Sequence, residues 1–220
     1  MNFENRADAG RRLAVVLSIY ADRKPVVLAL PRGGVPVAAI VAAVLNAPLD
    51  LVLVRKISTP GQPELALGAV VDGGHPTIVR NEQILASTGT SAAEFDAVCQ
   101  REMAEIERRR AHYLGKRAPL DVAGRVVIIV DDGIATGATM RVALRSTRQR
   151  GPTSLVLAVP VASPDALESL RPEVDEMICL TNPEGFLGVG QFYDDFRQVT
   201  DDEVVALLAL APDELSPTRR

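Results

Sequence analysis

The sequence has few of the residues that form disulfide frameworks or bind transition metals. Among 220 residues there are two cysteines, Cys99 and Cys179, and two histidines, His75 and His112. All four are isolated from one another, so no spacing typical of a metal cluster or of paired disulfides is present. We therefore expect no disulfide framework and no metal cluster, with a reducing cytoplasm as the default compartment.

Long apolar runs and an excess of positive charge are also lacking. The longest apolar stretch, residues 35–45, is too short to span a bilayer. Acidic and basic side chains in the first six residues do not match a signal peptide. The formal net charge of −4 argues against a surface that binds nucleic acid along a whole face. We expect no membrane partner and no stable nucleic-acid partner, so any anion must be held locally.

What the sequence does contain is an alternation of short apolar runs with helix-forming segments. Continuous apolar runs of this kind are typical of buried strands. They lie at residues 26–30, 51–54, 126–130 and 154–159. Segments with helical patterns follow at residues 35–46 and 140–150. This order favours an α/β protein with a parallel sheet, and 47% hydrophobic content is enough for one domain core.

Helix starts are indicated at three further places. A helical spacing of apolar residues predicts a first amphipathic helix over residues 5–20. Ser91 and Glu94 form a capping-box pattern that predicts the start of a long amphipathic helix. Thr200 and Glu203 form a second such pattern before a closing helix.

The most informative segment is residues 126–139. Asp131 and Asp132 directly follow an apolar run, which places them at the C-terminal end of a strand, where open α/β sheets bind ligands. The following loop, residues 136–139, leads into a helix and can direct backbone N–H groups and two hydroxyls at a phosphate. Two carboxylates could accept hydrogen bonds from vicinal hydroxyls. A ribose phosphate would therefore suit both the acid pair and the loop. The alternative is an ordinary strand–loop–helix corner with a solvated acid pair.

This segment resembles the binding motif of type I phosphoribosyltransferases, which transfer ribose 5-phosphate from 5-phosphoribosyl 1-pyrophosphate (PRPP) to a nitrogenous base and release pyrophosphate. The resemblance implies an α/β fold with a central, mostly parallel sheet flanked by helices, a helical insertion and a small hood. It implies PRPP contacts from Asp131, Asp132, Gly133, Ala135, Thr136, Gly137, Ala138 and Thr139. With Ala135 the motif most resembles adenine phosphoribosyltransferase, since hypoxanthine-guanine enzymes usually carry an aspartate there. The base remains unidentified.

A second loop, Arg32-Gly33-Gly34, also follows a predicted strand and precedes a helix. A Gly-Gly pair by itself most often makes only a turn. At this location the loop resembles the pyrophosphate loop of the same family. Arg32 would then bind the leaving group, while Gly33 and Gly34 would allow close approach of the backbone.

Arg55 and Lys56 follow the apolar run at residues 51–54, and Pro60-Gly61 and Pro63-Glu64 come shortly after them. Two cations at a strand end can neutralise pyrophosphate, and the prolines and glycine suit a mobile lid. Type I enzymes have a flexible loop at about this place. The alternative is a solvated Arg-Lys pair. Under the resemblance, Arg32 and Lys56 are the candidate catalytic residues.

The glycine- and aromatic-rich segment 181–200 resembles the C-terminal half of the family's hood, to which the N-terminal segment is a candidate addition. Phe186 and Tyr193 are the candidate base-binding residues, with packing in a small core as the alternative. By residue type alone, Glu64 and the pair Asp194-Asp195 are candidate proton acceptors.

We therefore expect one phosphoribosyltransferase domain over residues 1–220, with a core at about 24–180, a helical insertion at about 81–117 and a hood at about 181–200. The resemblance implies Mg²⁺ held mainly through PRPP, with Asp131 and Asp132 as its candidate protein ligands. The partners would be PRPP and an unidentified base, and a homodimer is left open. The alternative function is a non-catalytic sensor that binds PRPP and regulates a partner.

Overall fold

The computed structural model describes residues 2–59, 62–72 and 77–211, except for the side chains of residues 63 and 64. Pro60, Gly61 and His75 lie outside the described residues, as do the side chains of Pro63 and Glu64 that belong to the predicted lid. The chain divides into two compact units. One comprises residues 1–51 and 120–220, and the other comprises residues 52–119.

The first unit contains a five-stranded parallel sheet in the order β2-β1-β6-β7-β8. Its strands are β1 (Val26–Ala29), β2 (Leu49–Leu51), β6 (Val126–Val130), β7 (Ser154–Val161) and β8 (Glu176–Thr181). Every residue of β1, β6 and β7 is buried, which is why their sequences read as continuous apolar runs. The predicted fold class, an α/β protein with a parallel sheet flanked by helices, is confirmed.

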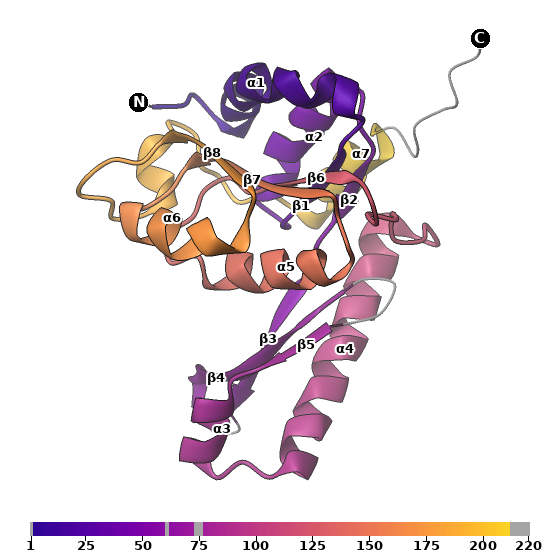
Figure 1. Cartoon of the computed structure of the whole chain (residues 1–220), viewed down its shortest axis with the longest axis vertical. Coiled ribbons are helices and arrows are strands. Elements are labelled where there is room, and N and C mark those ends of the chain that lie inside the picture. The colour runs from indigo at the N-terminus through magenta and orange to yellow at the C-terminus, as the bar shows by residue number, and fades with distance from the viewer. Residues whose placement is uncertain (1, 60–61, 73–76, 212–220) are drawn as a thin grey trace. The chain divides into compact units, whose positions relative to one another are not determined.

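Helices cover both faces of this sheet, with α1 and α2 on one face and α5 and α6 on the other (Figure 1). The α-helices of the unit are α1 (Arg6–Leu17), α2 (Gly34–Leu45), α5 (Ala138–Gln149), α6 (Pro164–Leu170) and α7 (Asp201–Ala209). Short 3₁₀ turns are η1 (Ser18–Arg23), η2 (Arg171–Glu173) and η3 (Val189–Phe192). The predicted capping box at Thr200 and Glu203 is present at the start of α7.

The second unit contains an antiparallel sheet in the order β3-β4-β5. Its elements are β3 (Val54–Thr59), β4 (Gln62–Val71), β5 (Thr77–Arg80), α3 (Glu82–Thr88) and α4 (Ala92–Leu114). The predicted capping box of Ser91 and Glu94 begins α4, and Phe95, Cys99 and Ile106 on its apolar stripe are buried. The helical insertion predicted from the sequence lies within this unit, which also contains three strands.

The strand predicted at residues 51–54 is wrong in its bounds, and so is the loop predicted to follow it. Leu51 ends β2, and Val54 begins β3. Between them the backbone of Leu53 is bonded to Asp72, whose carboxylate accepts from the Leu53 N–H at 2.7 Å. An apolar run shows no periodicity that could reveal such a break. Arg55 and Lys56 therefore lie within a strand rather than in a loop.

Candidate functional site

Asp131 and Asp132 are held at the C-terminal end of β6 by one contact within the pair and by contacts from two other segments. The Asp132 N–H donates to Asp131 Oδ1 at 2.8 Å. Arg6 Nε donates to Asp132 Oδ2 at 2.7 Å, and the two side chains are only 11% and 13% exposed. The Tyr193 hydroxyl donates to the backbone oxygen of Asp132 at 2.6 Å. The acid pair is therefore fixed in place and mostly buried.

The electrostatics of the acid pair favour a ligand that brings hydrogen-bond donors or positive charge. Burial raises the pKa of Asp131 well above its ordinary value, and the charge of the neighbouring Asp132 raises it further. Burial also raises the pKa of Asp132, although the Arg6 guanidinium opposes that shift. The raised pKa values show that the protein offsets only part of the cost of burying the two negative charges. Hydroxyl donors or a cation from a ligand would therefore stabilise the carboxylates.

The loop at Gly33 and Gly34 is in direct contact with the acid pair. It follows β1, which pairs in parallel with β6, so both strands end at the same edge of the sheet. A Cβ added to Gly33 would overlap the Asp132 carboxyl group and lie 2.6 Å from its Cγ. One added to Gly34 would lie 2.8 Å from the backbone oxygen of Val130. The Gly33 backbone is right-handed, with φ of −57°, so space rather than conformation requires glycine there.

Arg32 begins this second loop, after a cis peptide bond from Pro31. Its Nη1 atom is 3.5 Å from Asp201 Oδ1 at the start of α7, and both side chains are substantially exposed. An exposed ion pair of this length contributes little to stability. The guanidinium is therefore able to turn to another anion without much loss.

The third part of the site is the loop at residues 133–139. Gly133 packs against Val189, and the backbone oxygen of Ala135 accepts from the Ser163 hydroxyl at 2.6 Å. Gly137 has φ of +75° and is the N-cap of α5, with no side chain capping the helix. Thr136, Ala138 and Thr139 are exposed around this helix start. An uncapped helix N-terminus with exposed threonines suits an anion.

Arg55 and Lys56 belong to the second unit. Arg55 Nε donates to Glu102 Oε2 of α4 at 2.8 Å, which supports a structural role for this arginine. Lys56 is exposed on β3. Their predicted contribution to pyrophosphate binding, and the catalytic role of Lys56, stay predictions.

The predicted base-binding aromatics lie in a small core. Tyr193 is 6% exposed, and its ring centroid is 5.4 Å from that of Phe3. The half-buried Phe186 stacks on Phe192 with 5.5 Å between centroids. This arrangement favours the packing alternative, above all for Tyr193. The N-terminal segment does join residues 181–200, because the Phe3 N–H donates to the Phe192 oxygen at 2.8 Å.

Arg6 was missed by the sequence analysis, although it links the acid pair to the C-terminal segment. Besides its bond to Asp132, its Nη1 atom donates to the backbone oxygen of Arg197 at 2.8 Å. Its guanidinium carbon lies 4.0 Å from the centroid of the Phe196 ring. No sequence pattern indicates a pairing between residues 126 positions apart.

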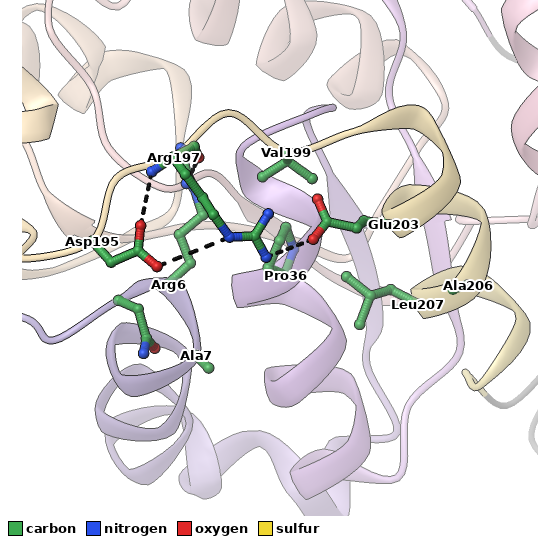
Figure 2. A pocket seen from close by; sticks show the side chains of 10 residues that line it. Arg6, Ala7, Pro36, Asp195, Arg197, Val199, Glu203, Ala206 and Leu207 are labelled. Atoms are coloured by element: carbon green, nitrogen blue, oxygen red, sulfur yellow. Dashed lines mark hydrogen bonds and ion pairs between the residues drawn. The ribbon is translucent and has the colours of Figure 1, made fainter.

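A cavity of about 450 Å³, here called the α7 cavity, is lined in part by Arg6 (Figure 2). Its lining includes Arg6, Pro36, Asp195, Arg197, Glu203 and Leu207. The Arg197 side chain extends across it, with Nη2 at 2.6 Å from Glu203 Oε1 and Nε at 3.9 Å from Asp195 Oδ2. The hydrogen bond from Arg197 lowers the pKa of Glu203 to about 2. Asp195, a candidate proton acceptor by type, thus lies on a cavity wall.

Metal binding by the protein alone is not indicated by the described parts of the chain. Within residues 2–59, 62–72 and 77–211, no group of three or more His, Cys, Asp or Glu side chains is placed to hold a metal ion. The acid pair offers two carboxylates, and Mg²⁺ commonly binds through one or two carboxylates together with substrate phosphates. The donor set therefore fits Mg²⁺ that is held largely by a phosphorylated ligand. Nor does any helix in these residues have the length and apolarity to cross a bilayer.

Fold and site together define a parallel α/β protein in which an acid pair, a glycine loop and an uncapped helix start follow neighbouring strands. Comparison with known proteins specifies the family. The phosphoribosyl transferase domain family matches residues 2–197. The chain therefore belongs to the phosphoribosyltransferases, as its acid motif predicted.

Individual relatives agree with this assignment. One protein in each of two Mycobacterium tuberculosis strains, CDC 1551 and H37Rv, is 45% identical over 206 residues, and their names assign them provisionally to the phosphoribosyl transferases. The match covers 94% of this chain but 46% of each relative, so the chain spans about half their length. Among solved structures, the chain is similar to TT1426 from Thermus thermophilus, with 43% sequence identity. The two structures superpose with a TM-score of 0.82, and the match covers 94% of this chain and 98% of TT1426.

Proposed function

We propose that this chain binds PRPP at the acid pair and transfers its ribose 5-phosphate to a nitrogenous base. The observation that carries the proposal is the contact of Gly33 with the Asp132 carboxyl group. Two loops that resemble the family's pyrophosphate and ribose-phosphate loops follow separate strands of the sheet. A single ligand that carries both a pyrophosphate and a ribose phosphate requires these two loops to meet at one edge of the sheet.

The sugar half of PRPP is assigned to Asp131, Asp132 and the loop at residues 136–139. The two carboxylates would accept hydrogen bonds from the 2- and 3-hydroxyls, which would offset the burial that raises their pKa values. The 5-phosphate would lie at the start of α5, which has no side-chain cap and where Thr136 and Thr139 are exposed.

The pyrophosphate half is assigned to Arg32, Gly33 and Gly34. Arg32 would leave its long ion pair with Asp201 and bind the leaving group, while the absence of side chains at the two glycines allows the backbone to approach. Mg²⁺ carried by PRPP would neutralise charge on the pyrophosphate, and Asp131 and Asp132 are the residues that would hold it.

In the proposed reaction the bond between the anomeric carbon and the pyrophosphate oxygen breaks. A bond from that carbon to the acceptor nitrogen forms, and the proton of that nitrogen passes to the departing pyrophosphate or to water. Positive charge develops on the sugar as pyrophosphate leaves, so rate depends on fixing the acceptor and stabilising the leaving group. A protein nucleophile is not needed for this displacement.

The experiment is pyrophosphate release from PRPP and Mg²⁺ in the presence of single purine and pyrimidine bases. We expect release with at least one base, and loss of that release in the double variant Asp131→Asn, Asp132→Asn, which also controls for contaminating activity. Release with no base, combined with intact PRPP binding, would favour the non-catalytic sensor instead.

A further inference from the structure

Two residues that line the α7 cavity are close to the loops assigned to the donor. Arg6 lines the cavity and also donates to Asp132 of the acid pair. Pro36, another lining residue, lies in the first turn of α2, two residues after Gly34. An acceptor bound in this cavity would therefore be separated from the acid pair by one side chain.

The walls of the α7 cavity combine apolar surface with one polar side. Pro36, Val199 and Leu207 supply apolar surface, which is the usual lining of small-molecule sites. The polar side is formed by two carboxylates, Asp195 and Glu203, and by the guanidinium between them. The volume of about 450 Å³ is within the range of cavities that hold small ligands.

Arg197 shows what kind of group these carboxylates accept. Its guanidinium is planar and carries N–H donors, and it lies between Glu203 and Asp195 as Figure 2 shows. The side chain is 64% exposed, so exchanging its surface ion pairs for solvent costs little. An amino group next to a ring N–H would present a similar planar row of donors to the same oxygens.

The charges around the cavity disfavour an acidic ligand. Arg6 is paired with Asp132, which leaves Arg197 as the positive partner of the two carboxylates Asp195 and Glu203. When Arg197 turns to solvent, both carboxylates face the cavity. A ligand that carries its own carboxylate would then meet like charge.

We propose that the α7 cavity binds the acceptor, and that this acceptor is an amino-substituted, non-acidic nitrogen heterocycle that displaces the Arg197 side chain from Asp195 and Glu203. The proposal rests on the proposed function, because it names the second substrate of that reaction. It assigns Arg197 as an internal competitor of the acceptor. If Arg197 were instead a ligand for an acidic acceptor, its removal would have the opposite effect.

The experiment measures pyrophosphate release by the full chain with PRPP and Mg²⁺. Guanine and isocytosine, in which the amino group adjoins a ring N–H, serve as amino-substituted probes, and nicotinate and orotate serve as acidic probes. We expect turnover with an amino-substituted probe and none with the acidic probes. Arg197→Ala should lower the KM for the active probe several-fold, because the competing guanidinium is gone.

A matched pair of variants tests the location. Ala206 and Ala209 are both exposed on α7, but only Ala206 is among the cavity-lining residues. Ala206→Leu should raise the KM for the active probe at least tenfold by filling the cavity, whereas Ala209→Leu should leave it unchanged. Both variants should retain PRPP binding, since neither touches the acid pair.

Three results would overturn this proposal while PRPP binding persists. They are turnover of acidic probes or of none of the four, a KM raised by Arg197→Ala, and equal behaviour of the two leucine variants. Absence of PRPP binding in calorimetry would instead contradict the proposed function itself. The two failures are thus distinguishable.

Discussion

Replacing Gly33 by alanine tests the contact between the two loops with a single methyl group. The Gly33 backbone is right-handed and accepts alanine without strain. Its new Cβ, however, would occupy the space of the Asp132 carboxyl group. The carboxylate must then move, and its ion pair with Arg6 must move with it.

The size of the effect follows from opposing contributions. Inserting a methyl group into a packed position costs about 1–3 kcal/mol. Alanine has less conformational freedom than glycine in the unfolded chain, which stabilises the folded state by about 0.4–1 kcal/mol. We therefore expect a loss of roughly 1–2 kcal/mol in the free energy of unfolding. A displaced Asp132 also loses a charge-assisted hydrogen bond to PRPP, worth about 1.5–3 kcal/mol, or about 10- to 100-fold in Kd.

The assays are urea unfolding and calorimetric titration with PRPP and Mg²⁺. Gly188→Ala is the matched control, because Gly188 is extended and an added Cβ there meets no atom within 4 Å. That control should match wild type in both assays. A folded Gly33→Ala variant that binds PRPP within twofold of wild type would refute the reasoning.

Two further predictions concern the charges of the acid pair. Asp131→Asn should stabilise the protein at pH 7, and this advantage should disappear toward pH 4. The reason is that burial raises the pKa of Asp131, so the stability of the wild type falls as the pH rises from the ordinary pKa of 3.8 through the pKa in the folded protein. A difference in melting temperature that is the same at all pH values would contradict this prediction. Arg6→Met should cost about 3–5 kcal/mol in urea unfolding, because it leaves the mostly buried Asp132 unpaired. Arg11→Met removes an exposed 3.7 Å ion pair with Asp8 and should cost less than about 1 kcal/mol, so equal losses in the two variants would contradict the buried-pair argument.

The parts of the site that follow parallel strands could be predicted from the sequence. Buried parallel strands have continuous apolar sequences, so β1 and β6 were recognisable, and the residues that follow them had to meet at one edge if the strands were neighbours. Asp131 and Asp132 were found in this way, whereas the role predicted for Gly33 rested on the family resemblance. Their contact depends on the strand order, which the sequence does not state.

The remaining parts depend on contacts between distant segments. Arg6 reaches Asp132 across 126 positions, and the α7 cavity brings Pro36 together with Arg197 and Leu207. No local periodicity encodes such pairings. Arg55 was predicted to lie in a loop because the apolar run before it continues through the break between β2 and β3 and so looks like one strand. In the structure Arg55 lies in β3.

The most direct test of the central claim is calorimetric titration of PRPP with Mg²⁺ into the wild-type chain and into the double variant Asp131→Asn, Asp132→Asn. The claim that the acid pair at the end of β6 holds the sugar predicts measurable binding to wild type and its loss in the folded double variant. Equal affinity of the two proteins for PRPP would contradict it.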